Sequence, residues 1–347
     1  MDGTRGMALH AVGSHGPADF LAIVGPTGSG KTALSLVIAT RIPGEIISMD
    51  SRQIYKGMDV GTGKVTAEEM GTVPHHGLDL KTPDETYSAG QFSRDAREWM
   101  GGIRSRGRVP LLVGGTGFFL RALTNPMFSQ PPLDVDRLEN LRAFLNALTE
   151  EDLGRYLAAL DPERAPQAHT GGRQRSTRAI EMALLTGRPL SWWHQEGPPS
   201  EAPLRGVILV LDMPRELLYE RINRRVREMF VGGLVDEVRG LVEMGYSPSS
   251  PGMTGAGYRE TLAFLAGELT QDQAIEEIRR SHRRYARRQV TWFRHQLPPD
   301  AVWLDGTLPE DRLADSAMEA WEALAAGEQA YTEPIRAASG RTRNGHE

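Results

Sequence analysis

The chain has 347 residues, 39% of them hydrophobic, with 38 glycines and no cysteine. This length predicts two domains, or one with a large insertion, and the composition is that of a protein with a packed core. Zero cysteines exclude disulfides, thiolate zinc sites and cysteine nucleophiles. The net charge of −5 does not by itself favour a polyanionic partner. No apolar run is long enough to span a bilayer, and the first twenty residues lack the apolar segment of a secretory signal, so we expect a cytoplasmic protein outside the membrane.

Short apolar runs separated by helical patterns predict the strands of a parallel sheet. The predicted strands are Phe20 to Val24, Glu45 to Met49, Val109 to Val113, Gly206 to Asp212 and Ala301 to Leu304. Helical patterns follow the first strand and extend from Arg215 to about Arg294, with a Gly, Pro and Ser-rich break at 245–257. Strands that alternate with helices indicate an α/β fold.

The character of the sequence changes between the third and fourth predicted strands. Residues 131–187 are rich in Leu, Ala, Arg and Glu and contain no convincing strand, which predicts a helical insertion. We therefore predict a core in two parts, 18–128 and 201–327, around a helical insertion at 129–200. Residues 1–17 and 328–347 are polar without periodicity and are predicted to be flexible ends.

A glycine-rich loop follows the first predicted strand. The run GPTGSGKT (25–32) fits the GxxxxGK[ST] pattern and stands between a strand and a helix, as that motif requires. Its N–H groups would surround an anion, and its side chains would add one positive charge and one hydroxyl for Mg²⁺. The predicted di- or triphosphate site is Gly25, Pro26, Thr27, Gly28, Ser29, Gly30, Lys31 and Thr32. The fold class is thus α/β, a P-loop NTPase-like parallel sheet flanked by helices, with a helical insertion domain.

Two usual companions of nucleotide hydrolysis are missing. The third strand runs into Val-Gly-Gly-Thr without the acidic residue that would bind Mg²⁺, and no Asn-Lys-x-Asp run selects guanine, which argues against a GTPase switch. An acid does follow the second strand: Asp50 would face the phosphate loop at the carboxyl edge of the sheet, where such folds bind ligands. Asp50 is a candidate base; the alternative is that it caps the following helix or supports Mg²⁺.

A run of arginines marks the end of the long helical region. Residues 279–295 contain Arg279, Arg280, Arg283, Arg284, Arg287, Arg288 and Arg294 and no acid. The first six share one half of a helix surface, and nothing within the run neutralises them. The insertion adds Arg173, Arg175, Arg178 and Arg188 against the single acid Glu181. These clusters predict a nucleic acid partner with salt-sensitive binding; the alternative is a solvated helix face.

Five motifs occur together and in order: GPTGSGKT (25–32), DSRQIYKGMDVGTGK (50–64), VGGTGFFLR (113–121), QRSTRAIE (174–181) and RRQVTWF (287–293). With them the chain, from about 20 to 304, resembles the bacterial tRNA dimethylallyltransferases of the isopentenyl-tRNA transferase family. These enzymes transfer the dimethylallyl group of dimethylallyl diphosphate to N6 of the adenine immediately 3′ of the anticodon. The resemblance implies that the loop holds the donor's diphosphate, with Mg²⁺ as cofactor, and this explains the missing acid.

The resemblance also implies roles for individual residues. Asp50 matches the base that takes the N6 proton, and Thr27, Lys31 and Arg221 would stabilise charge on the diphosphate, with Thr32 on Mg²⁺. With arginines of the basic run, the predicted tRNA contacts are Asp50, Ser51, Arg52, Gln53, Thr116, Gln174, Arg175, Ser176, Thr177, Arg178, Arg283, Arg284 and Arg287. The insertion would grip the anticodon arm of tRNA, and we expect a monomer. The chain departs from the family at Phe119, commonly Tyr, and at Thr254, commonly basic or Gln.

Two other functions fit part of these observations. A P-loop kinase of small metabolites would use ATP at the loop, Asp50 to deprotonate a hydroxyl and Arg221 as a lid arginine, but it leaves the basic run unused. A non-enzymatic, ATPase-like RNA-binding module would use the arginines but lacks the acid that binds Mg²⁺.

Overall fold

The computed structural model describes residues 18–71, 73–129, 131–167 and 172–325. The chain divides into two compact units, one of residues 1–121 and 205–347 and the other of residues 122–204. The predicted ends, 1–17 and 328–347, lie outside the described residues. No helix of the described part is long and apolar enough to cross a membrane.

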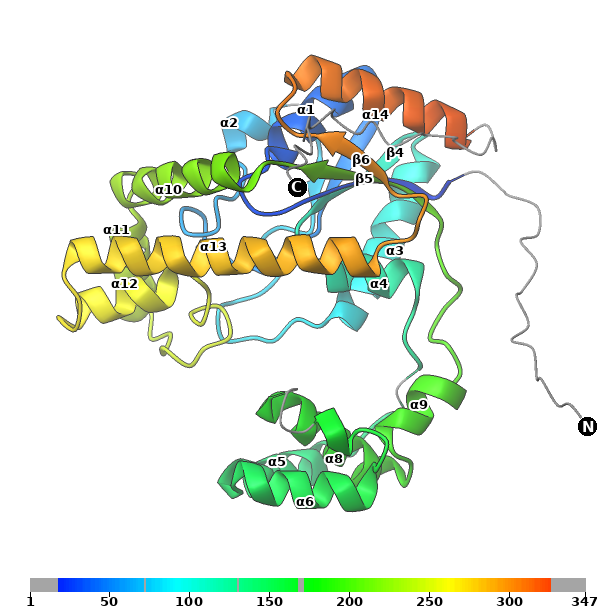
Figure 1. The fold of residues 1–347 in the computed structure, drawn as a ribbon, viewed down its shortest axis with the longest axis vertical. Helices are drawn as coiled ribbons and strands as arrows, with labels where there is room; N and C mark the ends of the chain where they lie inside the picture. Colours follow the sequence, from blue (N-terminus) through cyan, green and yellow to red (C-terminus); the bar gives the residue numbers. More distant parts are fainter. Residues whose placement is uncertain (1–17, 72, 130, 168–171, 326–347) are drawn as a thin grey trace, which may run out of the picture. The chain divides into compact units, whose positions relative to one another are not determined.

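The first unit is built on a six-stranded parallel sheet with the strand order β3-β2-β4-β1-β5-β6 (Figure 1). Its strands are β1 (Phe20–Val24), β2 (Gly44–Ser48), β3 (His75–His76), β4 (Val109–Gly114), β5 (Gly206–Asp212) and β6 (Val302–Asp305). Five of them are predicted by their apolar runs. Strand β3 has two residues, too few to give a periodic pattern. The α/β fold with a parallel sheet flanked by helices is confirmed.

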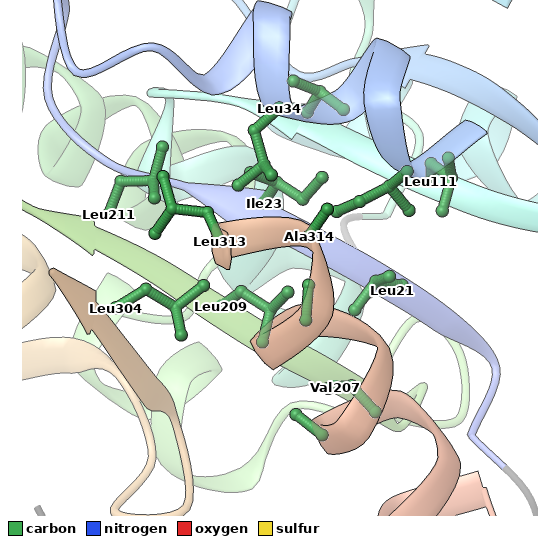
Figure 2. Close-up of a cluster of buried hydrophobic side chains, with 14 of the residues drawn as sticks. Leu21, Ile23, Leu34, Leu111, Val207, Leu209, Leu211, Leu304, Leu313 and Ala314 are labelled. Carbon is green, nitrogen blue, oxygen red and sulfur yellow. The ribbon is translucent and has the colours of Figure 1, made fainter. Parts of the chain in front are cut away.

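Helices cover this sheet on both faces and extend beyond its carboxyl edge. They are α1 (Lys31–Arg41), α2 (Ala67–Met70), α3 (Ala89–Ser105), α4 (Gly117–Thr124), α10 (Arg215–Val231), α11 (Leu234–Glu243), α12 (Tyr258–Leu265), α13 (Gln271–Gln296) and α14 (Glu310–Ala325). Leu21, Ile23 and Leu209 of the central strands pack with Leu34 of α1 and Leu313 of α14 (Figure 2). This apolar layer fixes the strand from which the phosphate loop departs.

A second apolar cluster joins the segment after β2 to the helices α10 to α13. Ile54 and Met58 are buried there against Val226 of α10, Val238 of α11 and Ile278 of α13. Helices α10 and α13 lie side by side (Figure 1). The cluster therefore holds residues 50–64 against the two helices that carry the arginines.

The second unit, residues 122–204, contains helices and one isolated bridge, between Phe128 and Pro199, in its described residues; the predicted insertion has the bounds 129–200. Its helices are α5 (Val135–Ala147), α6 (Glu150–Leu160), the 3₁₀ turn η1 (Ala165–Gln167), α8 (Arg173–Thr186) and α9 (Leu190–Glu196). Asp134 and Thr149 accept backbone N–H bonds at the starts of α5 and α6. Leu145, Leu157 and Ile180 are buried between the helices.

Candidate active site

The phosphate loop connects the end of β1 to the first turn of α1. Gly28 and Gly30 adopt positive φ angles of 83° and 97°, a conformation that side-chain-bearing residues rarely adopt. No side chain caps the start of α1, and the buried Ser29 hydroxyl has no hydrogen-bond partner in the described structure. Free N–H groups at a helix N-terminus bind anions. The loop is therefore shaped for an anion.

Lys31 stands at the entry of α1, where its ammonium donates to the carbonyl of Pro26 at 2.8 Å. Burial lowers the pKa of Lys31 to about 8; the negative charge of Asp50 opposes this shift, and the positive charge of Arg225 adds to it. A buried ammonium beside a guanidinium is stabilised when an anion arrives. The loop thus offers two positive charges to its ligand.

Two neighbouring cavities meet at Asp50. The smaller, of about 90 Å³, is lined by Lys31, Thr32 and Arg225 among others, and the larger, of about 410 Å³, by residues that include Arg52 and His282. Both cavities are lined by Thr27, Asp50, Thr62 and Tyr285. Asp50 can therefore reach a molecule in either cavity.

Asp50 follows β2 by two residues, and its carboxylate accepts the N–H of Arg52 at 2.8 Å. This bond closes a turn; the next helix, α2, starts at residue 67 and is capped by Thr66, so Asp50 is not a helix cap. The N–H of Ser51 donates to the Thr116 hydroxyl at 3.0 Å. The two predicted contact segments, 50–53 and the one around Thr116, thus lie against each other at the carboxyl edge of the sheet.

Gln289 of α13 lies inside the RRQVTWF motif but is not among the predicted site residues. Its amide oxygen accepts the N–H of Thr27 at 2.9 Å, and its amide nitrogen donates to the carbonyl of Gly115 at 2.9 Å. A Cβ at Gly115 would lie 2.1 Å from that nitrogen, and one at Gly114 would lie 2.1 Å from the carbonyl oxygen of Met49. Gly115 is therefore needed for the close approach of α13 to the end of β4, and Gly114 for the close approach of Met49 to β4.

Helix α10 places Arg225 in the smaller cavity, whereas the sequence analysis named Arg221. Arg225 lines the cavity, and its Nη1 lies 3.5 Å from the Thr27 hydroxyl. The predicted Arg221 is absent from the lining and lies against the loop at Gly30, where an added Cβ would be 3.7 Å from its Nη1. The two arginines are one turn apart on the same face, so the spacing could not distinguish them.

Two other side chains of α13 face the cavities. Burial and the charge of Asp50 raise the pKa of Tyr285 to about 12. Burial and the charge of Arg225 lower the pKa of His282 to about 4. Both side chains are therefore neutral at physiological pH.

Sequence comparison agrees with this geometry. The sequence model of the IPP transferase family matches residues 53–296, and that of isopentenyl transferases matches residues 18–82. The chain is 43% identical over 289 residues to the tRNA dimethylallyltransferase of Geobacillus thermodenitrificans, covering 83% of this chain and 90% of that protein. This chain belongs to the IPP transferase family.

Solved structures of the family have the same fold. The tRNA isopentenylpyrophosphate transferase of Bacillus halodurans superposes with a TM-score of 0.65 at 37% identity, covering 88% of this chain and 98% of that one. A eukaryotic dimethylallyltransferase acting on tRNA gives a TM-score of 0.79 at 26% identity, with 91% and 81% covered. The likeness spans both units of this family member.

The arginine row of α13 is not free of neighbouring acids, contrary to the sequence prediction. Glu276, one turn before the row, pairs with Arg283 at 2.7 Å and with Arg279 at 3.4 Å, and Glu277 pairs with Arg280 at 2.7 Å. The prediction was wrong because it considered only residues 279–295, whereas a side chain at position i meets those at i+3, i+4 and i+7. Within the part of the chain that the structure describes, Arg284, Arg287 and Arg288 are exposed and have no acidic partner; Arg284 donates to the Ser281 hydroxyl, and Arg288 lies over the ring of Tyr285.

Within the helical unit, the predicted contacts on α8 differ in exposure. Gln174 and Arg175 are exposed, Ser176 is buried, and Thr177 and Arg178 are half-buried. Arg178 pairs with Glu181, which also binds Arg142 at 2.8 Å. Arg173 donates to the carbonyls of Leu145, Asn146 and Leu148, so it caps the end of α5, and Arg188 stacks on Trp192.

Phe119 and Thr254, the two positions where the sequence resemblance implies a departure from the family, lie in different surroundings. Phe119 is buried, stacks on Phe92 with ring centroids 4.3 Å apart and meets the ring of Tyr87 edge-on. Thr254 lines the larger cavity and donates to the carbonyl of Pro251 at 2.7 Å.

Proposed function

We propose that this protein is a tRNA dimethylallyltransferase, which transfers the dimethylallyl group of dimethylallyl diphosphate to N6 of the adenine immediately 3′ of the anticodon and releases diphosphate. Membership of the IPP transferase family supports the reaction class. The observation that carries the proposal is the position of Asp50, where the cavity of the phosphate loop meets a larger cavity rimmed by arginines.

The donor would bind with its diphosphate on the phosphate loop. Lys31 and Arg225 bring positive charge to the smaller cavity, the Thr27 hydroxyl lies beside Arg225, and the amides at the start of α1 are uncapped. Arg221, next to Gly30, could meet the outer side of the diphosphate. These groups are fixed before the reaction and stabilise charge that develops on the leaving diphosphate.

We propose Mg²⁺ as the cofactor. The described residues contain no cluster of three acidic or histidine side chains, so a divalent ion here would depend on oxygens of the bound diphosphate. Mg²⁺ is commonly bound in this way, with few protein ligands, substrate phosphates and water. The Thr32 hydroxyl, which lines the smaller cavity, is the protein ligand that fits. A bound Mg²⁺ would supply charge neutralisation on the diphosphate.

The acceptor adenine would enter the larger cavity and meet Asp50. The N6 lone pair is delocalised into the ring, so the nitrogen is a poor nucleophile until its proton is removed. As the N6–C1 bond forms, the C1–O bond breaks and its electron pair leaves with diphosphate, while the Asp50 carboxylate takes the N6 proton. The base has to leave its stack first, which costs less in the single-stranded anticodon loop than in a duplex.

tRNA is the proposed macromolecular partner. The exposed Arg284, Arg287 and Arg288 would meet phosphates of the anticodon loop, and Arg284 and Arg288 also line the larger cavity. The predicted contacts Ser51, Arg52, Gln53 and Thr116 would meet the nucleotide at the cavity, and the exposed residues of α8 would grip the anticodon arm. We further propose that the protein acts as a monomer, and in the cytoplasm, where tRNA is its substrate.

A labelling experiment tests this reaction directly. The full chain is incubated with unmodified tRNA and either dimethylallyl diphosphate labelled at C1 or ATP labelled at the γ-phosphate. The proposal predicts label on tRNA with the first donor, recovered as N6-dimethylallyl adenosine after nuclease digestion. Labelling by ATP but not by the prenyl donor would replace the proposal with a kinase activity.

A further inference from the structure

Glu237, in the first turn of α11, binds an unusual number of donors for a residue outside the cavities. Its carboxylate accepts the backbone N–H groups of Asp59, Val60 and Gly61 at 2.7, 2.6 and 3.0 Å. It also accepts the hydroxyl of Tyr258 at 2.6 Å. A carboxylate that accepts several N–H bonds holds a loop firmly because each bond is charge-assisted.

The same loop is fixed at its other end by a buried ammonium. The Lys64 side chain is 4% exposed, and its Nζ donates to the carbonyl of Tyr55 at 2.9 Å and to the carboxylates of Asp59 and Asp79 at 2.5 and 2.6 Å. Residues 59–64, here called the anchored loop, are therefore held at both ends. Between the two anchors stand Thr62 and Gly63, which line the smaller cavity.

The carbonyl groups between the anchors bind the cavity's arginine. Nη2 of Arg225 donates to the carbonyl oxygens of Thr62 and Gly63 at 3.1 and 3.4 Å, while Nη1 is directed toward the Thr27 hydroxyl. The fit is tight, because an added Cβ at Gly63 would lie 1.8 Å from Nη2. The position of these two carbonyls thus sets the direction of the guanidinium.

We infer that Glu237 is a positioning residue of the donor site: it places the anchored loop so that Thr62 and Gly63 orient Arg225 toward the phosphate loop. Glu237 itself lines neither cavity around Asp50, so its effect passes through its partners: the anchored loop, and Tyr258, which with Gly61 lines the larger cavity. The inference deepens the proposed function, on which it rests for the identity of the anion as the donor's diphosphate. A residue that merely stabilised the fold would leave affinity for diphosphate unchanged in the folded protein.

The substitution Glu237→Gln keeps the size of the side chain but replaces one acceptor oxygen by an NH₂ group that faces backbone donors. We expect affinity for inorganic diphosphate, measured by titration calorimetry on the full chain, to fall about tenfold or more, the loss of one charge-assisted contact by Arg225. The KM for dimethylallyl diphosphate should rise and kcat should fall.

Glu45→Gln is the matched control. Glu45 is a buried carboxylate of β2 that binds Arg106 and His76 and lines neither cavity. Its loss should lower the melting temperature without changing the affinity of the folded protein for diphosphate. A Glu237→Gln protein that melts earlier but binds diphosphate with the parent affinity would overturn the inference.

A double-mutant cycle tests whether the effect passes through Arg225. If it does, Glu237→Gln should weaken diphosphate binding in the parent but add less than twofold in an Arg225→Gln background. Fully additive losses would overturn the inference. Because inorganic diphosphate needs no tRNA and no prenyl group, this result is independent of the labelling experiment, so a failure of the proposed function would be seen separately.

Discussion

The exposed arginines of α13 give a prediction that separates phosphate contact from mere positive charge. Replacing Arg284 and Arg287 by Gln removes two charges that no described acid pairs with. Each phosphate contact on a single strand contributes about 0.7 to the slope of log affinity against log salt, so two contacts contribute about 1.4. When the salt is raised from 50 to 200 mM, the fold decrease in tRNA affinity should therefore be about seven times smaller for the variant than for the parent.

The control pair lies one turn earlier on the same helix. Arg279 and Arg283 have side chains that are 20% and 23% exposed and are paired with Glu276. Their double replacement by Gln removes the same charge but no phosphate contact, so the slope should stay at the parent value. Fluorescence anisotropy of labelled unmodified tRNA at five salt concentrations measures both slopes. An unchanged slope in the Arg284 and Arg287 variant, or an equal fall in both variants, would refute this account of the basic helix.

Three further predictions follow from the site. Because burial lowers the pKa of Lys31 to about 8, the affinity for inorganic diphosphate should fall as the pH rises through about 8. Calorimetry on Lys31→Met should show weaker diphosphate binding whose affinity no longer falls in this pH range. Gly115→Ala places a methyl group 2.1 Å from Nε2 of Gln289 and should slow prenyl transfer while the protein stays folded, as kinetics and circular dichroism will show. The pKa of His282 is about 4 in the folded protein and about 6.5 in the unfolded protein, so between these pH values the unfolded state binds a proton that the folded state does not. The free energy of unfolding should therefore fall by about 3 kcal/mol as the pH is lowered from 6.5 to 4, and urea unfolding of His282→Gln should lack this fall.

The sequence predicts the strands and the loops that directly follow them. Phe20–Val24 and Gly206–Asp212 are predicted to the residue because buried parallel strands form continuous apolar runs bounded by polar or glycine-rich segments. The phosphate loop and Asp50 are predicted for a related reason: each directly follows such a strand, and parallel strands end at one edge of the sheet.

The remainder of the site depends on contacts between segments that are distant in sequence. Gln289 meets the phosphate loop across 262 positions; it lies inside the RRQVTWF motif, but the motif does not show which of its residues reaches that loop. Glu237 acts on a loop 176 to 178 positions away through backbone N–H groups, which leave no trace in side-chain motifs. Arg225 and Arg221 share one helix face, and it is Arg225 that donates to the carbonyls of Thr62 and Gly63.

The central claim is that the Asp50 carboxylate takes the N6 proton during prenyl transfer, and one measurement tests it most directly. Single-turnover transfer is followed at saturating dimethylallyl diphosphate and tRNA for the parent and Asp50→Asn, with a melting curve for each. Asn keeps the size and the N–H bond to Arg52 but cannot accept the proton. The account predicts a rate roughly 10² to 10⁴ times lower in a protein that melts near the parent temperature. A folded Asp50→Asn protein that transfers the prenyl group at the parent rate would contradict it.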